Sequence, residues 1–408
     1  MAKKYLASQW KTLLTDPRHL AVVDGFEKVF GAGKEISLFS APGRTEIGGN
    51  HTDHQHGRAL AASINLEAVA AVCENDLGQM RIHSEGHSFC VVDVDDLSIH
   101  EEEKNSSMSL IRGVASAFQD MGCPVRGFDA YVSSNVLRGS GLSSSAAFEV
   151  LLGVILNGLF FENKASATRI AQIGQYAENV YFGKPSGLLD QMASSVGNLV
   201  AMDFNDPKNP IVEKVDFDFA KTGYSLCIID SGADHADLTD EYAAIPMELK
   251  VISQHFGKEV LRDIPEEDFY RELPTLRALA GDRAVLRAIH FYGDNARVPK
   301  QVQALKDGDF DTFLNLMKES GRSSWMYLQN VIPAGYKAHQ EMGVALALCE
   351  KLLGGKGAFR VHGGGFAGTV QAFVPNDMLE TFRTEMERVL GAGSCHVLSI
   401  RPMGGVEL

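Results

Sequence analysis

Hydrophobic and polar residues follow two periods along the chain, and these periods divide it into helices and strands. Helical spacing or a helix-rich pattern marks residues 1–33, 109–122, 240–356 and 376–393, with a strongly apolar helix from about Ala146. Alternation with a period of two predicts strands at residues 35–44, 66–74, 89–96, 127–136, 223–232 and 394–402. A strand, a glycine turn and a second strand are expected within residues 358–375. The first strand is expected to end in a turn at Pro42 and Gly43.

This order of elements predicts an α+β protein with two domains, residues 1–205 and 206–408. A length of 408 residues suits two to three domains. The longest apolar run, residues 150–161, is too short to span a bilayer and contains Asn157, so it is interpreted as a buried helix.

Composition narrows the possible partners. The net charge of −14 disfavours nucleic acid and membrane surfaces, because both attract basic faces. Six widely spaced cysteines without a Cys-x-x-Cys motif are typical of a reducing compartment. No targeting segment is visible, so a cytoplasmic protein with a small-molecule partner is expected. The sequence does not fix the oligomeric state, and a monomer is the expectation.

A glycine- and serine-rich loop between a strand and the apolar helix carries the strongest single signal. The loop comprises Gly139, Ser140, Gly141, Leu142, Ser143, Ser144 and Ser145. Small residues allow close approach of a charged ligand, and a helix N-terminus favours phosphate. A serine-rich helix cap without a ligand is the alternative. The loop lacks the spacing of a Walker A motif.

A second polar cluster, "GGNHTDHQHG" at residues 48–57, places three histidines between glycines. It admits a zinc site, a solvated turn or a turn that binds a polar small molecule. Zinc is the weaker alternative, because no convincing fourth ligand lies nearby in the sequence.

Four stretches in order resemble the galactokinase family of the GHMP kinases. "VLRGSGLSSSAAFEV" (136–150) resembles the ATP-binding motif, and "APGRTEIGGNHTDHQHG" (41–57) resembles the signature A-P-G-R-V-N-L-I-G-E-H-T-D-Y-N-D-G. "AENVYFGKPSGLLDQMASSVG" (177–197) is similar to the segment with the catalytic aspartate, and "GGGFAGTV" (363–370) to the third motif. The resemblance implies a two-domain GHMP kinase fold with the active site in the cleft between the domains.

The resemblance also implies an ATP-dependent sugar 1-kinase that converts D-galactose to α-D-galactose 1-phosphate. Asp190 would be the catalytic base, Arg44 would keep it ionised, and Ser145 and Glu178 would bind Mg²⁺. Residues 139–145 would bind ATP. Taken singly, Asp190 would be a helix cap, while Arg44 and Glu178 would be surface residues.

The expected sugar contacts are Asn50, His51, Asp53, Gly187 and Tyr242. A carboxylate and an imidazole suit a polyol, because hydroxyl groups both donate and accept hydrogen bonds. Unaided, Tyr242 would be assigned to the core or an interface. The glycines expected on the phosphate side, which alone would make a tight hairpin, are Gly363, Gly364, Gly365 and Gly368.

Several positions depart from the family signature. Glu46 replaces its asparagine, Asn50 its glutamate and His54 its tyrosine, while Arg58 follows the motif. The added positive charge keeps a C6-oxidised sugar such as galacturonate as an alternative substrate, and Asn50→Glu is expected to be tolerated if the substrate is galactose. A further alternative is a non-catalytic sugar sensor, which would be expected to have lost Asp190 or an intact loop. His362 also replaces a family threonine.

Overall fold

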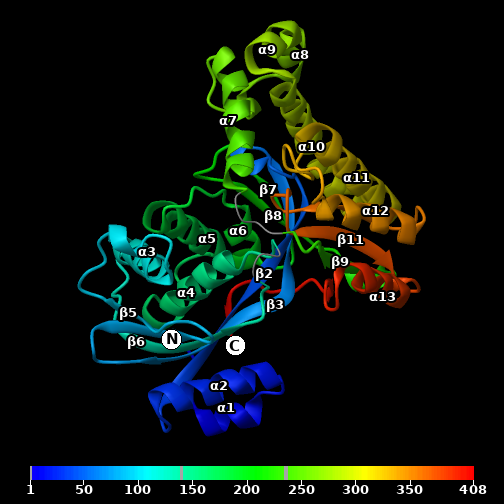
Figure 1. The fold of residues 1–408 in the computed structure, drawn as a ribbon. Coiled ribbons are helices and arrows are strands. Elements are labelled where there is room, and N and C mark those ends of the chain that lie inside the picture. The colour runs from blue at the N-terminus through cyan, green and yellow to red at the C-terminus, as the bar shows by residue number, and fades with distance from the viewer. Residues whose placement is uncertain (1, 138–140, 234–237) are drawn as a thin grey trace.

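Two sheets organise the chain (Figure 1). The computed structural model describes residues 2–137, 141–233 and 238–408. The first sheet runs in the order β1-β2-β3-β6-β4-β5, with β13 added at β2 and the β7–β8 pair at β3. Its strands are β1 Tyr5–Leu6, β2 Glu35–Gly48, β3 Arg58–Glu74, β4 Gln79–Ser84, β5 Cys90–Asp93, β6 Phe128–Ser134, β7 Leu199–Asp203, β8 Ile211–Val215 and β13 Val406–Glu407.

The second sheet is antiparallel and has the order β10-β11-β9-β12. Its strands are β9 Tyr224–Asp230, β10 Ala358–His362, β11 Thr369–Pro375 and β12 Cys395–Leu398. The predicted strand, glycine turn and strand within 358–375 are thus confirmed as β10 and β11.

Helices cover both sheets. They are α1 Ala7–Leu13, α2 Pro17–Phe30, α3 Ser107–Asp120, α4 Ser144–Phe160, α5 Ala167–Tyr176, α6 Leu189–Val196, α7 Thr239–His255, α8 Glu266–Arg271, α9 Leu273–Ala280, α10 Asp282–Lys306, α11 Phe310–Ser323, α12 Glu341–Leu353 and α13 Leu379–Leu390. The described helices include none that is both long and apolar enough to cross a membrane. The predicted helix at 109–122 corresponds to α3, and the stretch 240–356 is helix-rich as expected.

Alternation along β2 and β3 buries both faces of the first sheet. Leu38 and Val69 pack with α1 and α2 on one face, while Phe39 and Ala70 pack with α4 on the other. The helix α4 is apolar around its circumference because α3, α5 and α6 cover the side that faces away from the sheet. This packing fixes the N-terminus of α4, where the glycine- and serine-rich loop ends.

The expected turn at Pro42 and Gly43 is wrong, because β2 continues through both residues to Gly48. The register against β3 shifts between Pro42 and Arg44. Proline has no backbone N–H to donate to the neighbouring strand. Because the register shifts at this position, no hydrogen bond from Pro42 is needed and the strand continues. The continuation carries Arg44 and the residues after it into the centre of the molecule.

The first sheet takes strands from both sides of residue 205. The strand β8 pairs with β7, and the C-terminal β13 pairs with β2. An isolated bridge between Ile64 and Ile400 adds a further connection. The last residues of the chain therefore return to the sheet that its first residues build.

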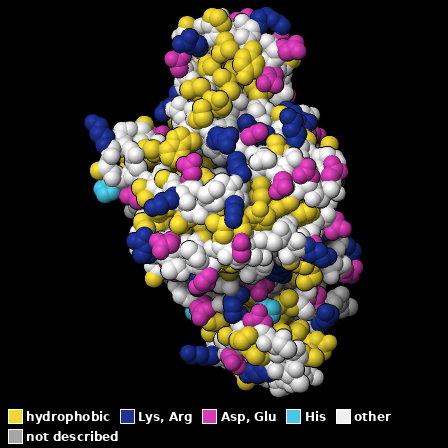
Figure 2. Space-filling view, turned by 90° about the vertical axis from the view of Figure 1, so that its right-hand side faces the viewer, with side chains coloured by type: hydrophobic (Ala, Val, Ile, Leu, Met, Phe, Trp, Pro, Cys, Tyr) yellow, Lys and Arg dark blue, Asp and Glu magenta, His cyan; other side chains and the backbone are white. Residues whose placement is uncertain are grey.

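The helices α7, α8, α9 and the start of α10 project from the rest of the molecule at the top of Figure 1. A separate hydrophobic cluster holds this projection together. Hydrophobic side chains also lie on its surface, as the top of Figure 2 shows, and Met247 is 66% exposed and Leu279 55% exposed.

A cluster of phenylalanines joins α11 to the second sheet, and its loss is expected to destabilise the fold. The Phe313 ring centroid lies 5.5 Å from that of Phe373 and 6.0 Å from that of Phe219, and Phe313 is fully buried. We expect Phe313→Ala to lower the free energy of unfolding by about 3–5 kcal/mol in urea denaturation. The control is Ile211→Ala on β8, where the side chain is 70% exposed and a change under about 0.5 kcal/mol is expected. Equal effects of the two substitutions would contradict the assignment of this core.

Candidate active site

Arg44 and Asp190 form the centre of the site. The Nε and Nη2 atoms of Arg44, on β2, each lie 2.7 Å from Oδ1 of Asp190, in the first turn of α6. The Ser143 hydroxyl donates to Oδ2 of Asp190, and Nη1 of Arg44 donates to the Gly141 carbonyl. The backbone N–H of Arg44 also donates to the Leu142 carbonyl at 3.1 Å. Three stretches that lie far apart in the sequence thus meet at one carboxylate.

The carboxyl group of Asp190 is held ionised. Burial opposes its ionisation, but the charge of Arg44 and the hydrogen bonds from Ser143 and Arg44 outweigh burial, so its pKa lies below the ordinary value. The Asp190 side chain remains 36% exposed, whereas Arg44 is 8% exposed. The arrangement leaves an ionised and partly exposed hydrogen-bond acceptor.

The glycine- and serine-rich loop leads directly into α4. Gly139 and Ser140 lie outside the described residues. Gly141 has a φ of 68° and Ser143 a φ of 56°, both in the left-handed region, and α4 begins at Ser144. A cavity of about 590 Å³ opens beside Ser144 and Ser145. Such a volume beside a helix N-terminus suits a ligand with phosphate groups.

Glu178 lies in a group of polar residues behind this loop. It belongs to a short π-helix, Ala177–Phe182, that follows α5. The Nζ atom of Lys184 lies 2.9 Å from Oε1 of Glu178, and Ser186 and Gln191 donate to Oε2 at 2.6 and 2.9 Å. The Glu178 side chain is only 5% exposed.

Sequence inspection missed Glu149, which lies one turn after Ser145 on α4. It is fully buried, accepts one hydrogen bond from Gln191 at 2.9 Å, and has no partner for Oε1 among the described residues. Burial, with repulsion from Glu178, holds its pKa well above the ordinary value. Its position inside an apolar helix is the signal that it is buried.

Asp53, in the turn after β2, lies near Asp190 and against Gly187. The backbone N–H of His54 donates to its Oδ1 at 2.9 Å. A Cβ atom at Gly187 would lie only 1.7 Å from Oδ2 of Asp53, so this close approach requires glycine. Burial, with repulsion from Asp190, raises the pKa of Asp53 to about 6.

His51 and His54 are uncharged, and among the described residues neither belongs to a group of side chains that could hold a metal ion. Nε2 of His51 lies 2.9 Å from the Gly364 carbonyl, to which it donates. Burial lowers the pKa of His51 to about 4 and that of His54 to about 3. Among the described residues, the group of His, Cys, Asp and Glu side chains close enough to share a cation lies elsewhere, at Asp16, His19 and Glu67. The geometry therefore gives the zinc interpretation no support.

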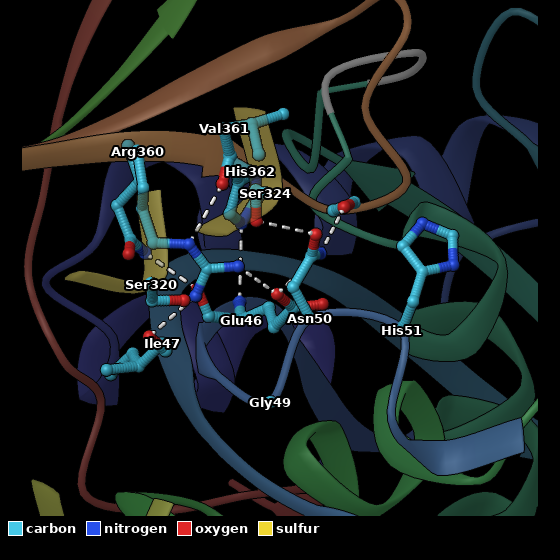
Figure 3. A network of polar contacts seen from close by, with 12 residues as sticks. Glu46, Ile47, Gly49, Asn50, His51, Ser320, Ser324, Arg360, Val361 and His362 are labelled. Carbon is cyan, nitrogen blue, oxygen red and sulfur yellow. Dashed lines mark hydrogen bonds and ion pairs between the residues drawn. The ribbon is translucent and has the colours of Figure 1, made fainter. Parts of the chain in front are cut away.

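Asn50 lies in the wall behind the turn, and the contacts it makes do not place it at the expected sugar-facing position (Figure 3). It is fully buried, and its Nδ2 donates to Glu46 at 3.0 Å and to the Gly363 carbonyl at 2.7 Å. Its Oδ1 accepts from Asn330 at 2.9 Å and from Ser324 at 3.3 Å. The amide therefore has no hydrogen-bonding capacity left for a ligand.

Glu46 and Asn50 together exchange an amide and a carboxylate relative to the family signature. Arg360, on β10, is fully buried and donates to Oε1 of Glu46, and its Nη1 donates to the Ile47 carbonyl at 2.7 Å. Burial raises the pKa of Glu46, although the charges of Arg360 and Arg44 oppose this shift. The signature's asparagine and glutamate have changed places, so the pair is retained and its charge has moved.

The backbone N–H of Asn50 anchors the turn to α10. It donates to Oδ2 of Asp294 at 2.8 Å, and the Asn50 carbonyl lies 2.9 Å from Nε2 of His290. The added cation Arg58 does not face the turn's ligand side as a free charge, because its Nε lies 2.8 Å from Oδ2 of Asp203. Arg262 shares the same carboxylate oxygen at 2.9 Å.

The glycine turn between β10 and β11 lies against both loops. The Tyr242 hydroxyl donates to the Gly365 carbonyl at 2.8 Å, and its ring packs so closely that a Cβ at Gly364 would lie 2.7 Å from it. A Cβ at Gly363 would lie 3.9 Å from the Cα of Gly141. The Gly368 carbonyl accepts from the Ser231 hydroxyl at 2.6 Å. The carbonyls of this turn are thus used within the protein.

His362 connects the glycine turn to β2. The Glu46 backbone N–H donates to its Nε2 at 3.3 Å, which assigns Nε2 as an acceptor and leaves Nδ1 to donate to Thr369 at 2.9 Å. Burial lowers the pKa of His362 well below its ordinary value. A neutral histidine therefore replaces the family's threonine while still making polar contacts.

The raised pKa of Asp53 predicts a pH-dependent stability. The folded-state pKa is higher than the unfolded value near 3.8, so stability is present at low pH and is lost as the pH rises from about 4 to about 6. We expect Asp53→Asn to match the wild type near pH 4 and to exceed its free energy of unfolding at pH 8 by at most about 3 kcal/mol. Urea denaturation at both pH values measures the difference, with the exposed Asp95→Asn as control. A gain that is independent of pH would contradict the assignment.

Comparisons with known proteins agree with this geometry. The model described as GHMP kinases N terminal domain matches residues 109–198, and the model described as galactokinase galactose-binding signature matches residues 24–74. The galactokinase of Glaesserella parasuis serovar 5 is 32% identical over 372 residues, which cover 88% of this chain and 90% of that protein. The galactokinase of Streptomyces coelicolor is 30% identical over 355 residues, which cover 86% of this chain and 88% of that protein.

Solved structures show the same relationship. The crystal structure of Lactococcus lactis galactokinase complexed with galactose has a TM-score of 0.81 and 26% identity, and the match covers 95% of this chain and 99% of that chain. A mevalonate kinase structure, with a TM-score of 0.63 and 14% identity over 89% of this chain and 99% of that chain, shares the fold. Taken with the sequence relatives, these matches show that the chain belongs to the galactokinase family of the GHMP kinases.

Proposed function

We propose that this protein is an ATP-dependent sugar 1-kinase that converts D-galactose and ATP to α-D-galactose 1-phosphate and ADP. The single observation that carries the proposal is the ionised Asp190, held by Arg44 and Ser143 beside the loop that opens onto the cavity. A sugar sensor without catalytic activity would not need this pair. The same arrangement therefore favours an active enzyme.

Asp190 is proposed to orient the C1 hydroxyl and accept its proton. The C1 oxygen then forms a bond to the γ-phosphorus, while the bond from that phosphorus to the β–γ bridging oxygen breaks and ADP leaves. Arg44 keeps Asp190 ionised and lies where it can offset charge on the transferring phosphoryl group. Phosphoryl transfer depends chiefly on such positioning and charge stabilisation.

We further propose that residues 139–145 bind the ATP phosphates, and that Ser145 and Glu178 hold Mg²⁺. The donor set fits the ion, because Mg²⁺ prefers oxygen ligands. The carboxyl groups of Glu149, Glu178 and Asp190 act on one another here, and Glu149 Oε1 has no partner among the described residues. A further cation suits this excess of carboxyl groups. When bound, Mg²⁺ would neutralise charge on the β- and γ-phosphates.

The sugar is proposed to bind between Asp53, His51, Gly187 and Tyr242, with the glycine turn 363–365 and Gly368 beside the phosphates. Asp53 is the proposed hydroxyl partner. Asn50 is proposed to act behind the turn, by holding its backbone. Its role is therefore one of positioning and not of direct contact.

Electrostatics favour galactose over galacturonate. The positive charge that motivated a C6-oxidised substrate is absent from the ligand side: burial lowers the pKa of His51 and His54 to about 4 and about 3, and Arg58 is paired with Asp203. Asp53 and Asp190 border the same region, so an anionic sugar would be repelled.

The proposed location is the cytoplasm, and the proposed state is a monomer. The six cysteines, all described, are free, as expected in a reducing compartment. Size-exclusion chromatography with light scattering would test the monomer directly.

Asp190→Asn tests the proposed base. We expect kcat to fall by roughly a hundredfold or more, because the amide cannot accept the proton, while ATP binding changes little. The unfolding midpoint is expected to fall, because Arg44 loses its charged partner. A coupled assay of ADP release measures kcat, and calorimetry measures ATP binding. The exposed Asp95→Asn is the control, and wild-type turnover in Asp190→Asn would reduce that residue to a structural role.

Exchange of Glu46 and Asn50 tests whether this buried pair supports the turn at residues 48–57. Asn50→Glu alone puts two carboxylates together in a buried site, and like charges about 4 Å apart at an intermediate effective dielectric cost on the order of 4 kcal/mol. The contact with Glu46 therefore reverses the tolerance expected from the signature alone: we expect this variant to be destabilised and to raise the KM for galactose by about tenfold or more. Glu46→Asn alone leaves Arg360 buried without its ion pair, so it is also expected to be destabilised.

The double variant Glu46→Asn/Asn50→Glu is expected to recover most of both losses, because it restores one carboxylate and one amide. The measurements are kcat/KM for galactose and galacturonate and the free energy of unfolding for all four proteins. Additive losses in the double variant would refute the exchange. A wild type that prefers galacturonate would overturn the substrate and leave the kinase assignment standing.

A further inference from the structure

A second cavity, distinct from the one beside the ATP loop, lies between α11, α12 and β10. Its volume is about 490 Å³, which is within the range of small-molecule sites. Lys318 and Arg322 of α11 line it, and Lys356 lines it from the turn before β10. Figure 2 shows the side of the molecule on which α11 and α12 lie, and there Lys and Arg side chains lie beside hydrophobic ones.

The charge of this cavity contrasts with that of the chain. The chain has 52 acidic and 38 basic residues, yet the cavity is lined by four cations and a single acid, Glu350. Of the four cations, Arg360 is paired with Glu46. Lys318, Arg322 and Lys356 form no ion pair within the described part of the chain, and Lys318 donates to the Gly355 carbonyl at 3.3 Å. Three cations around one hollow would recognise a phosphate or carboxylate.

The apolar part of the lining suits a planar ring. Trp325 and Met326 border the cavity and are 42% and 56% exposed, and Phe359 lies on the β10 side. Trp325 and Met326 belong to a one-turn π-helix, Ser324–Leu328, a conformation that is frequent at functional sites. An indole beside cations can stack on an aromatic ring while the cations bind its acidic group.

Residues that line or adjoin the cavity also contact the turn at residues 48–57 from behind. Ser324 begins the π-helix and donates to Oδ1 of Asn50 at 3.3 Å. Arg360 lines the cavity and donates to Glu46 and to the Ile47 carbonyl. A ligand that shifts the π-helix or β10 would therefore act on the residues that hold the turn 48–57.

We propose that this cavity, which we call the α11–α12 site, binds a small phosphate-bearing molecule with a planar ring and that this binding alters sugar affinity. Binding at the α11–α12 site does not depend on the proposed kinase activity. The effect of that binding on sugar affinity does rest on the proposed function. Coupling between two sites of one protein typically changes affinity by about 5- to 150-fold.

The first test is binding, with uridine monophosphate as the probe because it carries both a ring and a phosphate. The chain has two tryptophans, and Trp10 is buried in the first domain's helical layer, so Trp325 reports on the site. We expect the probe to quench fluorescence in the wild type at millimolar concentration and not in Trp325→Phe. Uridine and inorganic phosphate should each bind at least about tenfold more weakly.

Charge reversal supplies the matched control. Arg322→Glu and Lys356→Glu should weaken quenching by about tenfold or more, whereas Lys250→Glu, an exposed reversal on α7, should not. Absence of quenching in the wild type, equal quenching in Arg322→Glu and Lys250→Glu, or equal binding of uridine would each overturn the site.

The second test is coupling. At saturating probe, the KM for galactose should change about fivefold or more in the wild type and not in Arg322→Glu. Quenching without a change in KM would overturn the regulatory role. A protein that binds the probe but phosphorylates no sugar would overturn the proposed function and leave the site in place.

Discussion

The contact between Arg44 and Asp190 is the constraint on which the site depends. Asp190 is partly buried, and burial alone would favour its protonated form, which cannot accept a proton. Arg44 reverses this balance because it is itself buried and held by both Asp190 and the Gly141 carbonyl. The ionised Asp190 in turn helps to raise the pKa of Asp53 to about 6. One ion pair therefore influences the protonation of two carboxyl groups.

The buried network around Glu46, Asn50 and Arg360 fixes the sugar turn relative to the second sheet. Removing one member of a buried ion pair is strongly destabilising, so this pair is tolerated only because its partners are complete. Arg360 donates to Glu46 and to two carbonyls, and Asn50 uses both ends of its amide. The geometry of the turn thus depends on residues more than 200 positions away along the chain.

Much of the fold, and the meeting of Arg44, Asp190 and the glycine- and serine-rich loop, could be predicted from sequence, because both leave local patterns. The helices and strands followed their periods, and ordered motifs brought Arg44, Asp190 and the loop to one place. The turn expected at Pro42 was wrong, since a proline in a long strand can be absorbed by a shift in register. The burial of Asn50 could not be predicted, because it depends on packing by distant elements, whereas the burial of Glu149 is signalled by the apolar helix around it.

The turn at residues 48–57 illustrates why the electrostatic potential of a site cannot be judged by counting charged residues along the sequence. Histidines at positions 51 and 54 suggest a basic turn, yet burial keeps both neutral, and Arg58 is held in an ion pair with Asp203. The carboxyl groups of Asp53 and Asp190 are what border the ligand side.

The same lesson applies to the departures from the family signature. When the chain is compared with the signature one position at a time, the signature's amide is lost at Glu46 and its carboxylate is lost at Asn50. In three dimensions they are a single exchange, because the side chains hydrogen-bond each other at 3.0 Å and Arg360 accompanies the displaced charge. A pair of substitutions that looks like a change of substrate is therefore a rearrangement of one buried hydrogen-bonded pair, and Asp53 and Asp190 keep the region before it acidic.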